Sequence, residues 1–131
     1  MCQSRTKFII FELMKAKNKH IAKLIRKTIS SIDPDAEVIL YGSRARGDES
    51  YDSDWDILVL TDYQVNSGIE RRFRNKLYDL ELETGESFSV FAYSKHNWKS
   101  IQKATPFFQN VSREGIILWI LMKKSHTFNT G

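Results

Sequence analysis

The sequence predicts an α/β (α+β) domain in which a small mixed β-sheet is flanked by helices. Two segments carry apolar residues every three or four positions, which is typical of amphipathic helices, and three short runs are rich in the β-branched and aromatic residues of strands. Helical and strand-like segments alternate along the chain, which favours helices layered on a sheet. The chain has 131 residues, 41% of them hydrophobic, enough for one compact core and not for two.

The first half of the chain contains one predicted helix and two predicted strands. The helix begins at His20, because one face of it is apolar over Ile21, Leu24, Ile25, Thr28 and Ile29. Pro34 ends this helix, since proline lacks a backbone donor and keeps the preceding residue out of the helical region. Residues 37–41 (EVILY) and 54–61 (DWDILVLT) are predicted strands. The polar stretch between them is a predicted loop with one helical turn over residues 44–45.

The second half contains another helix, a third strand and shorter elements. Residues 69–80 form the helix, with apolar positions at Ile69, Phe73, Leu77 and Leu80. Residues 87–93 (SFSVFAY) alternate, so that one face of a strand carries Phe88, Val90 and Ala92 and the other Ser87, Ser89 and Phe91. Ser94 is a candidate N-cap for a short helix, and Thr105, followed by proline, is a candidate N-cap for the next. Residues 115–120 (GIILWI) are a last apolar strand or a helix end.

The domain organisation follows from these elements. Residues 20–122 form the predicted domain, preceded by an N-terminal extension (1–19) whose order the sequence does not decide and followed by a polar tail (123–131). Cys2 is the only cysteine, so the sequence has no disulfide framework and no zinc-binding cysteine pattern. The apolar segment 8–14 is too short for a membrane span and is not followed by a signal-peptide cleavage pattern. We therefore expect a soluble, cytoplasmic protein.

The charge pattern indicates little by itself. A net charge of +4 suits a ligand that carries phosphate groups, but it is too small and too evenly spread to indicate nucleic-acid binding. The basic residues of segment 71–76 are expected to form a solvated helix face, and contact with RNA or DNA through them is a less favoured alternative. Asp48, Glu49 and Asp52 are expected to be solvated loop charges.

Two aspartates separated by one residue, Asp54 and Asp56, open the second strand. On an extended strand these side chains point to the same face, while Trp55 and Ile57 point to the other. The two carboxylates repel each other, and a divalent cation would remove that conflict. Because the neighbouring ligands are oxygen atoms, without cysteine or histidine, the pattern predicts a hard ion, Mg²⁺ or Mn²⁺.

A glycine-serine turn at the end of the first strand complements this pair. Gly42 allows the backbone to approach a phosphate closely, and a following helical turn would direct free N–H groups toward it. Ser43 adds a hydroxyl group. Arg44 and Arg46 carry guanidinium groups suited to phosphate oxygens, but their spacing does not let both face one ligand.

These residues form a recognisable pattern, GSxxRG followed by SDxDxxV, made by Gly42, Ser43, Arg46, Gly47, Ser53, Asp54, Asp56 and Val59. The pattern resembles the nucleotidyltransferases of the DNA polymerase beta type, specifically their minimal, single-domain (MNT) members. The resemblance implies a palm-like mixed sheet, nucleotide binding by Gly42, Ser43, Arg46 and Ser53, and metal binding and catalysis by Asp54 and Asp56. The implied reaction is Mg²⁺-dependent transfer of a nucleoside monophosphate from an NTP, with ATP favoured, to a hydroxyl acceptor.

One position departs from the family pattern. Active members carry a third carboxylate on a later strand, and here the third strand has Ser87 or Ser89 on the face that should carry it. Glu86 and Glu83 are the only acids close by, and Glu86 is the candidate replacement. Serine does not substitute for a carboxylate as a metal ligand or base, so a second hypothesis is a nucleotide-, metal- or partner-binding module with weakened catalysis.

The acceptor is the remaining question. The chain has no room for a separate acceptor-binding domain, so the resemblance suggests a second protein. Minimal family members are often paired with a helical HEPN partner, and the nucleotidyltransferase then serves as the antitoxin of a toxin–antitoxin pair. Self-association is an alternative, because several aromatic residues have no assigned place.

Overall fold

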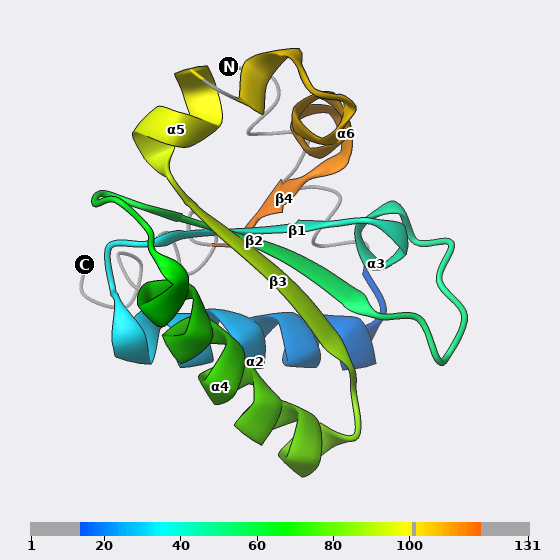
Figure 1. The fold of residues 1–131 in the computed structure, drawn as a ribbon. Coiled ribbons are helices and arrows are strands. Elements are labelled where there is room, and N and C mark those ends of the chain that lie inside the picture. Colours follow the sequence, from blue (N-terminus) through cyan, green and yellow to red (C-terminus); the bar gives the residue numbers. More distant parts are fainter. Residues whose placement is uncertain (1–13, 101, 119–131) are drawn as a thin grey trace, which may run out of the picture.

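The computed structural model describes residues 14–100 and 102–118, which form a four-stranded mixed sheet with helices on both faces (Figure 1). The strands are β1 (Glu37–Tyr41), β2 (Trp55–Thr61), β3 (Phe88–Ser94) and β4 (Ile116–Ile117), in the order β3-β2-β1-β4. β1 is antiparallel to β2 and to β4, whereas β2 and β3 are parallel. The predicted fold class is confirmed.

Two long helices cover one face of this sheet. They are α2 (Ala16–Ile32) and α4 (Ser67–Thr84), which lie side by side beneath the strands in Figure 1. The apolar stripes predicted for both helices are buried against the sheet. Asn66 caps α4 by accepting a hydrogen bond from the Ile69 N–H, and α2 ends before Asp33, as the proline pattern predicts.

The start of α2 differs from the prediction, because the helix begins at Ala16 instead of His20. The added turn lacks apolar residues on the core face, so its periodicity is weak. Its buried residue is Asn18, which donates a hydrogen bond of 2.8 Å to the Glu49 carboxylate. A hydropathy pattern does not detect a helix turn that is held by a buried polar contact.

Shorter helices cover the opposite face of the sheet. They are α5 (Lys95–Ser100), a 3₁₀ turn (Gln102–Ala104) and α6 (Pro106–Glu114). Trp98 packs edge-on against Phe107 at 5.4 Å between ring centroids, in a cluster that also contains Phe108. The predicted caps are confirmed, because Ser94 accepts from Asn97 N–H and Thr105 accepts from Phe108 N–H.

The strand faces follow the predicted alternation. In β2, Trp55, Ile57 and Val59 belong to the core between the sheet and the helices α2 and α4. Leu58 and Leu60 belong to the cluster between the sheet and the helices α5 and α6. By alternation Asp56 lies on the same face as Leu58. Within the described ranges, no helix combines the length and the apolar character needed to cross a membrane. The predicted tail, residues 119–120 of the last predicted strand, and most of the N-terminal extension lie outside the described residues.

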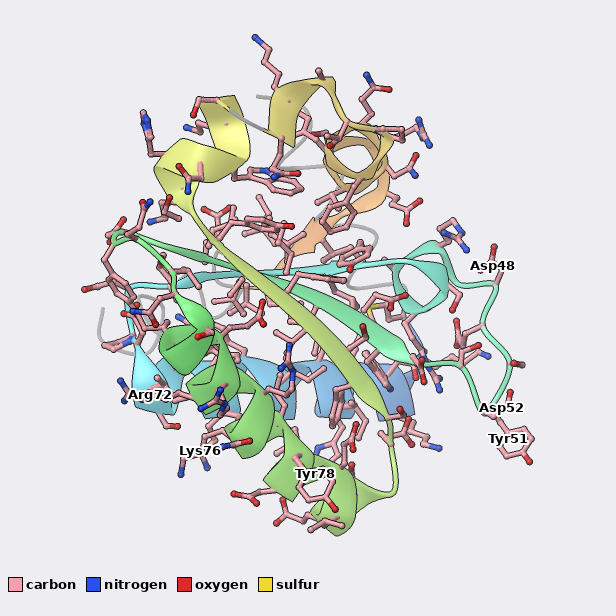
Figure 2. All side chains as sticks on the ribbon, in the orientation of Figure 1. Asp48, Tyr51, Asp52, Arg72, Lys76 and Tyr78 are labelled. Atoms are coloured by element: carbon pink, nitrogen blue, oxygen red, sulfur yellow. The ribbon has the colours of Figure 1, made fainter. Side chains whose placement is uncertain are left out.

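The basic face of α4 is exposed, as predicted. Arg71, Arg72 and Arg74 are all exposed, and Arg74 pairs with Glu70 one turn earlier. Figure 2 shows Arg72, Lys76 and Tyr78 along the outer side of this helix.

Candidate functional site

The aspartate pair lies where β2 begins. Asp54 is exposed just before the strand, and Asp56 is partly buried, paired with Tyr41 of β1 on one side and with Ser89 of β3 on the other. Partial burial raises the pKa of the Asp56 carboxyl, and the negative charge of Asp54 raises this pKa further. The negative charge of Asp54 therefore acts on Asp56 and disfavours the charged form of the Asp56 carboxyl.

Gly42 lies directly against Asp56. Its backbone has φ 78° and ψ −161°, a combination that is essentially restricted to glycine. A Cβ atom at this position would be 2.2 Å from Asp56 Oδ2, closer than any side chain tolerates. Glycine is therefore required here both by the backbone conformation and by the close approach of the carboxylate.

The turn after Gly42 is the short helix α3 (Ser43–Arg46), at the end of β1 (Figure 1). The Gly42 carbonyl accepts hydrogen bonds from the N–H groups of residues 45 and 46, and the Ser43 carbonyl accepts from Gly47 N–H at 2.8 Å. The predicted helical turn over residues 44–45 is confirmed. It places Ser43 as the first residue of α3, next to the glycine that contacts Asp56.

The two arginines of α3 have different roles. Arg44 is buried and donates to the backbone carbonyls of Tyr51 (3.2 Å) and Ser53 (2.9 Å), so it holds the loop that leads to Asp54. Arg46 has a side chain that is 47% exposed, and its positive charge acts on Asp56 by lowering the pKa. Arg46 is therefore the arginine of α3 whose charge acts on Asp56, and its contact with a nucleotide stays a prediction.

Ser53 shapes the same loop. Its hydroxyl accepts a hydrogen bond of 3.0 Å from the Ser50 N–H, and its carbonyl is one of the acceptors for Arg44. These contacts fix the chain immediately before Asp54. A direct contact of Ser53 with a nucleotide stays a prediction.

Glu49 is not the solvated loop charge that the sequence suggested. Its side chain is 4% exposed, it accepts from Asn18, and it pairs with Lys15 at 3.6 Å and with Arg44 at 3.9 Å. Burial alone would raise the pKa of Glu49, but the hydrogen bond from Asn18 and the two cations lower it below its ordinary value. The expectation fails because the partner residue lies on α2, far away in the sequence.

Asp48 and Asp52 are exposed, as predicted, and Figure 2 shows them on the outer loop together with Tyr51. Tyr51 is 90% exposed at the tip of this loop.

The structure also shows which residue occupies the place on β3 where the family resemblance implies a third carboxylate. Ser89 pairs in register with Asp56, so serine occupies the neighbouring place on β3. Glu86 does not replace the missing acid, because its carboxylate accepts from Trp55 Nε1 at 2.8 Å and pairs with Arg44 at 3.4 Å. Trp55 points to the sheet face opposite to Asp56. The carboxylate of Glu86 is therefore held on the wrong face.

Sequence reasoning missed one acidic residue of this site, Glu114, the last residue of α6. Its Oε2 accepts from the Gly42 N–H at 2.7 Å and from Arg46 Nη1 at 3.1 Å, and its charge contributes to the raised pKa of Asp56. Gly42 and Glu114 are 72 positions apart in the sequence. The only local signal is that an acid at a helix C-terminus is disfavoured by the helix dipole, which suggests that it serves a contact elsewhere.

Comparisons with known proteins identify the family and similar folds. Residues 22–108 match the family model described as nucleotidyltransferase domain. The fold is similar to the crystal structure of a toxin–antitoxin with AMP-PNP, at 21% identity and a TM-score of 0.58, over 75% of this chain and 72% of that chain. It is also similar to a mutant of the toxin–antitoxin MntA-HpeT, at 18% identity and a TM-score of 0.55, over the same shares of the two chains. No curated protein matches the sequence. The family match covers more than half of the chain and includes the whole glycine-serine turn and both aspartates, so the chain belongs to the nucleotidyltransferase domain family.

Proposed function

We propose that this protein transfers a nucleoside monophosphate, with AMP favoured, from an NTP to a hydroxyl group on a partner protein, and that it requires Mg²⁺ or Mn²⁺. The observation that supports this most directly is the contact of Gly42 with Asp56 beside Asp54, within a matched nucleotidyltransferase domain. It brings a backbone suited to phosphate within reach of two carboxylates suited to a metal.

The aspartates fit a divalent cation. Burial and the charge of Asp54 both raise the pKa of Asp56, so positive charge at this point would relieve an existing conflict. Oxygen ligands of this kind are those that Mg²⁺ and Mn²⁺ prefer. Bound between Asp54 and Asp56, such an ion would neutralise charge on the phosphates and on the departing pyrophosphate.

The remaining residues bind and orient the nucleotide. Gly42 and Ser43 lie at the turn that approaches the phosphates, and Arg46 adds a cation on the same side. Arg44 keeps the loop before Asp54 in place through its bonds to backbone carbonyls. The acceptor hydroxyl oxygen attacks the α-phosphorus and loses its proton to solvent, the bond from the α-phosphorus to the oxygen that bridges to the β-phosphate breaks, and pyrophosphate leaves in line.

The two similar structures support the choice of nucleotide and partner. One is a toxin–antitoxin crystallised with AMP-PNP, an ATP analogue, and the other is a toxin–antitoxin mutant in which two aspartates, two positions apart, are replaced by glutamate. We infer that this protein is the antitoxin of such a pair and that its acceptor is a helical toxin of the HEPN type.

The test is transfer of label from ATP labelled at the α-phosphate, with Mg²⁺ and a candidate partner. We expect the double variant Asp54→Asn, Asp56→Asn to lose transfer by more than about 10³-fold, since both carboxylates hold the metal. Asp52→Asn is the matched control, because it removes an exposed acid from the same loop and should leave transfer unchanged. Transfer that survives the double substitution would refute the site assignment.

Ser89 supports a second candidate function, a module that binds nucleotide and metal with little turnover. Serine beside Asp56 provides no third carboxylate. In that case Ser89→Asp should raise transfer by at least about tenfold, because it adds an acid next to Asp56. Ser87→Asp is the control, since Ser87 is exposed and precedes β3. If both substitutions leave transfer unchanged and the wild-type protein turns over, the module hypothesis is wrong.

A further inference from the structure

The Glu114 carboxylate is held by two groups that the proposed function assigns to the nucleotide phosphates. Its Oε2 accepts from the Gly42 N–H at 2.7 Å, and Arg46 Nη1 lies 3.1 Å from Oε2 and 3.3 Å from Oε1. A carboxylate and a phosphate present the same kind of oxygen to such donors. The Gly42 N–H has a single hydrogen to donate, so a carboxylate and a phosphate exclude each other there, and Glu114 also occupies the Nη1 side of Arg46.

Helix stability does not explain this contact. Glu114 is the last residue of α6, where the helix dipole disfavours a negative charge. Its side chain is 15% exposed, and its charge acts on Asp56, which lies against Gly42. The Glu114 carboxylate is thus partly desolvated near another acid. The hydrogen bonds from Gly42 and Arg46 offset this unfavourable environment.

A second acid, Asp48, also binds the Arg46 guanidinium and leaves the Nη1 edge of that group available. Its Nε donates to Asp48 Oδ2 at 3.1 Å, whereas Nη1 faces Glu114. If Glu114 moved away, Asp48 would still hold the guanidinium in place. Asp48 therefore orients Arg46, and Glu114 competes for the edge of Arg46 that a phosphate would bind.

We propose that Glu114 is an internal competitor for the phosphate position, which a nucleoside triphosphate must displace from Gly42 and Arg46 before it binds. This inference rests on the proposed function. It makes Glu114 a specificity-determining residue, because a ligand has to replace both of its bonds to bind well. A triphosphate with its metal does so, whereas a weaker anion does not.

The experiment is calorimetric titration of the full chain with MgATP and with magnesium tripolyphosphate. Glu114→Gln keeps the size of the side chain and its oxygen acceptor, so the fold should be retained, but it removes the charge that binds Arg46. We expect about tenfold tighter binding of both ligands, because the fraction of protein with the site free rises. An equal gain for the two ligands would place the effect on the phosphates and not on the base.

Two further variants separate contact from charge. Glu114→Asp keeps the charge but is one methylene shorter, so it should also tighten binding if the contact with Gly42 is what competes. Asp52→Asn removes a unit charge from the exposed loop without removing an acid that holds Arg46, and it should leave binding unchanged. Tightening by Asp52→Asn that equals the gain with E114Q would show a general charge effect and overturn the inference.

The results also separate the inference from the proposed function. If the wild-type protein binds MgATP, Asp56→Asn abolishes this binding, and E114Q binds equally or more weakly, then the function stands and the competitor role is wrong. If neither the wild-type protein nor E114Q binds MgATP, both proposals fail, because the site with its competitor weakened should bind.

Discussion

Replacing Gly42 by alanine tests the close contact on which the site depends. Two costs can be worked out from the structure. The backbone at φ 78° and ψ −161° is a conformation that costs a residue with a Cβ atom about 1–3 kcal/mol. In addition, the new Cβ would lie 2.2 Å from Oδ2, 3.1 Å from Cγ and 3.3 Å from Cβ of Asp56. The contact at 2.2 Å requires the Asp56 carboxylate to leave its position, and the two longer contacts require the rest of the side chain to shift by a few tenths of an ångström.

Gly85 provides the matched control. It also has φ 78°, with ψ 4°, but a Cβ atom there would meet nothing within 4 Å. Gly85→Ala should therefore cost about 1–2 kcal/mol of stability through backbone strain alone and leave the site intact. Gly42→Ala should lose at least as much stability and should also displace the Asp56 carboxylate that we propose as a metal ligand.

The assay combines urea denaturation with calorimetric titration of MgATP. For Gly42→Ala we expect MgATP affinity to fall by about 10- to 100-fold, the range typical of changes in a residue that positions a metal ligand. For Gly85→Ala we expect the wild-type affinity. Equal MgATP affinity in the two variants would refute the claim that Gly42 and Asp56 act together.

Two further predictions concern stability. Burial and the charge of Asp54 raise the folded-state pKa of Asp56 above its ordinary value. The stability that Asp56 contributes is therefore fully present below its unfolded-state pKa and is lost as pH rises through its folded-state pKa. Asp56→Asn should thus stabilise the fold at pH 7 by up to about 1 kcal/mol after solvent screening, and urea denaturation should show this gain shrinking toward pH 4. Arg44→Leu should lower the free energy of unfolding by about 3 kcal/mol, because it leaves Glu49 and Glu86 without their buried arginine. The control Arg46→Leu, at an exposed side chain, should lower it much less. Similar losses in the two variants would contradict the anchoring role of Arg44.

Most of the fold was predictable because its signals are local. The apolar stripes of α2 and α4, the alternation in β3 and the caps at Ser94 and Thr105 each depend on residues within a few positions of one another. The first turn of α2 escaped detection because it is held by Asn18 and Glu49, a polar contact across 31 positions. Periodicity reports burial of apolar side chains and does not report burial of paired polar ones.

The site divides in the same way. The contact of Gly42 with Asp56 was predictable, because a strand places alternate residues on one face and a glycine turn has a recognisable pattern, whereas Asp54 lies just before β2 and not on it. Glu114 and the true surroundings of Glu86 were not, because a glutamate side chain can point in many directions and its partner is set only by the packing of distant elements. The sequence identified the phosphate and metal ligands proposed here but not the acid that competes with one of them.

The pairing of β1 with β2 also has a consequence for how the protein folds. Tyr41 and Asp56 meet across an antiparallel strand pair joined by residues 42–54, so pairing β1 with β2 brings the glycine turn and the acids together at a lower cost in loop entropy than the contacts made later in the chain. Ser89 joins these residues only after the chain has passed through α4 and β3 has paired in parallel with β2. Glu114 joins them only when α6 docks. A folding intermediate that contains the β1–β2 pair would already hold the groups that we assign to metal and phosphate, and hydrogen exchange in its strands should be slower than in α6.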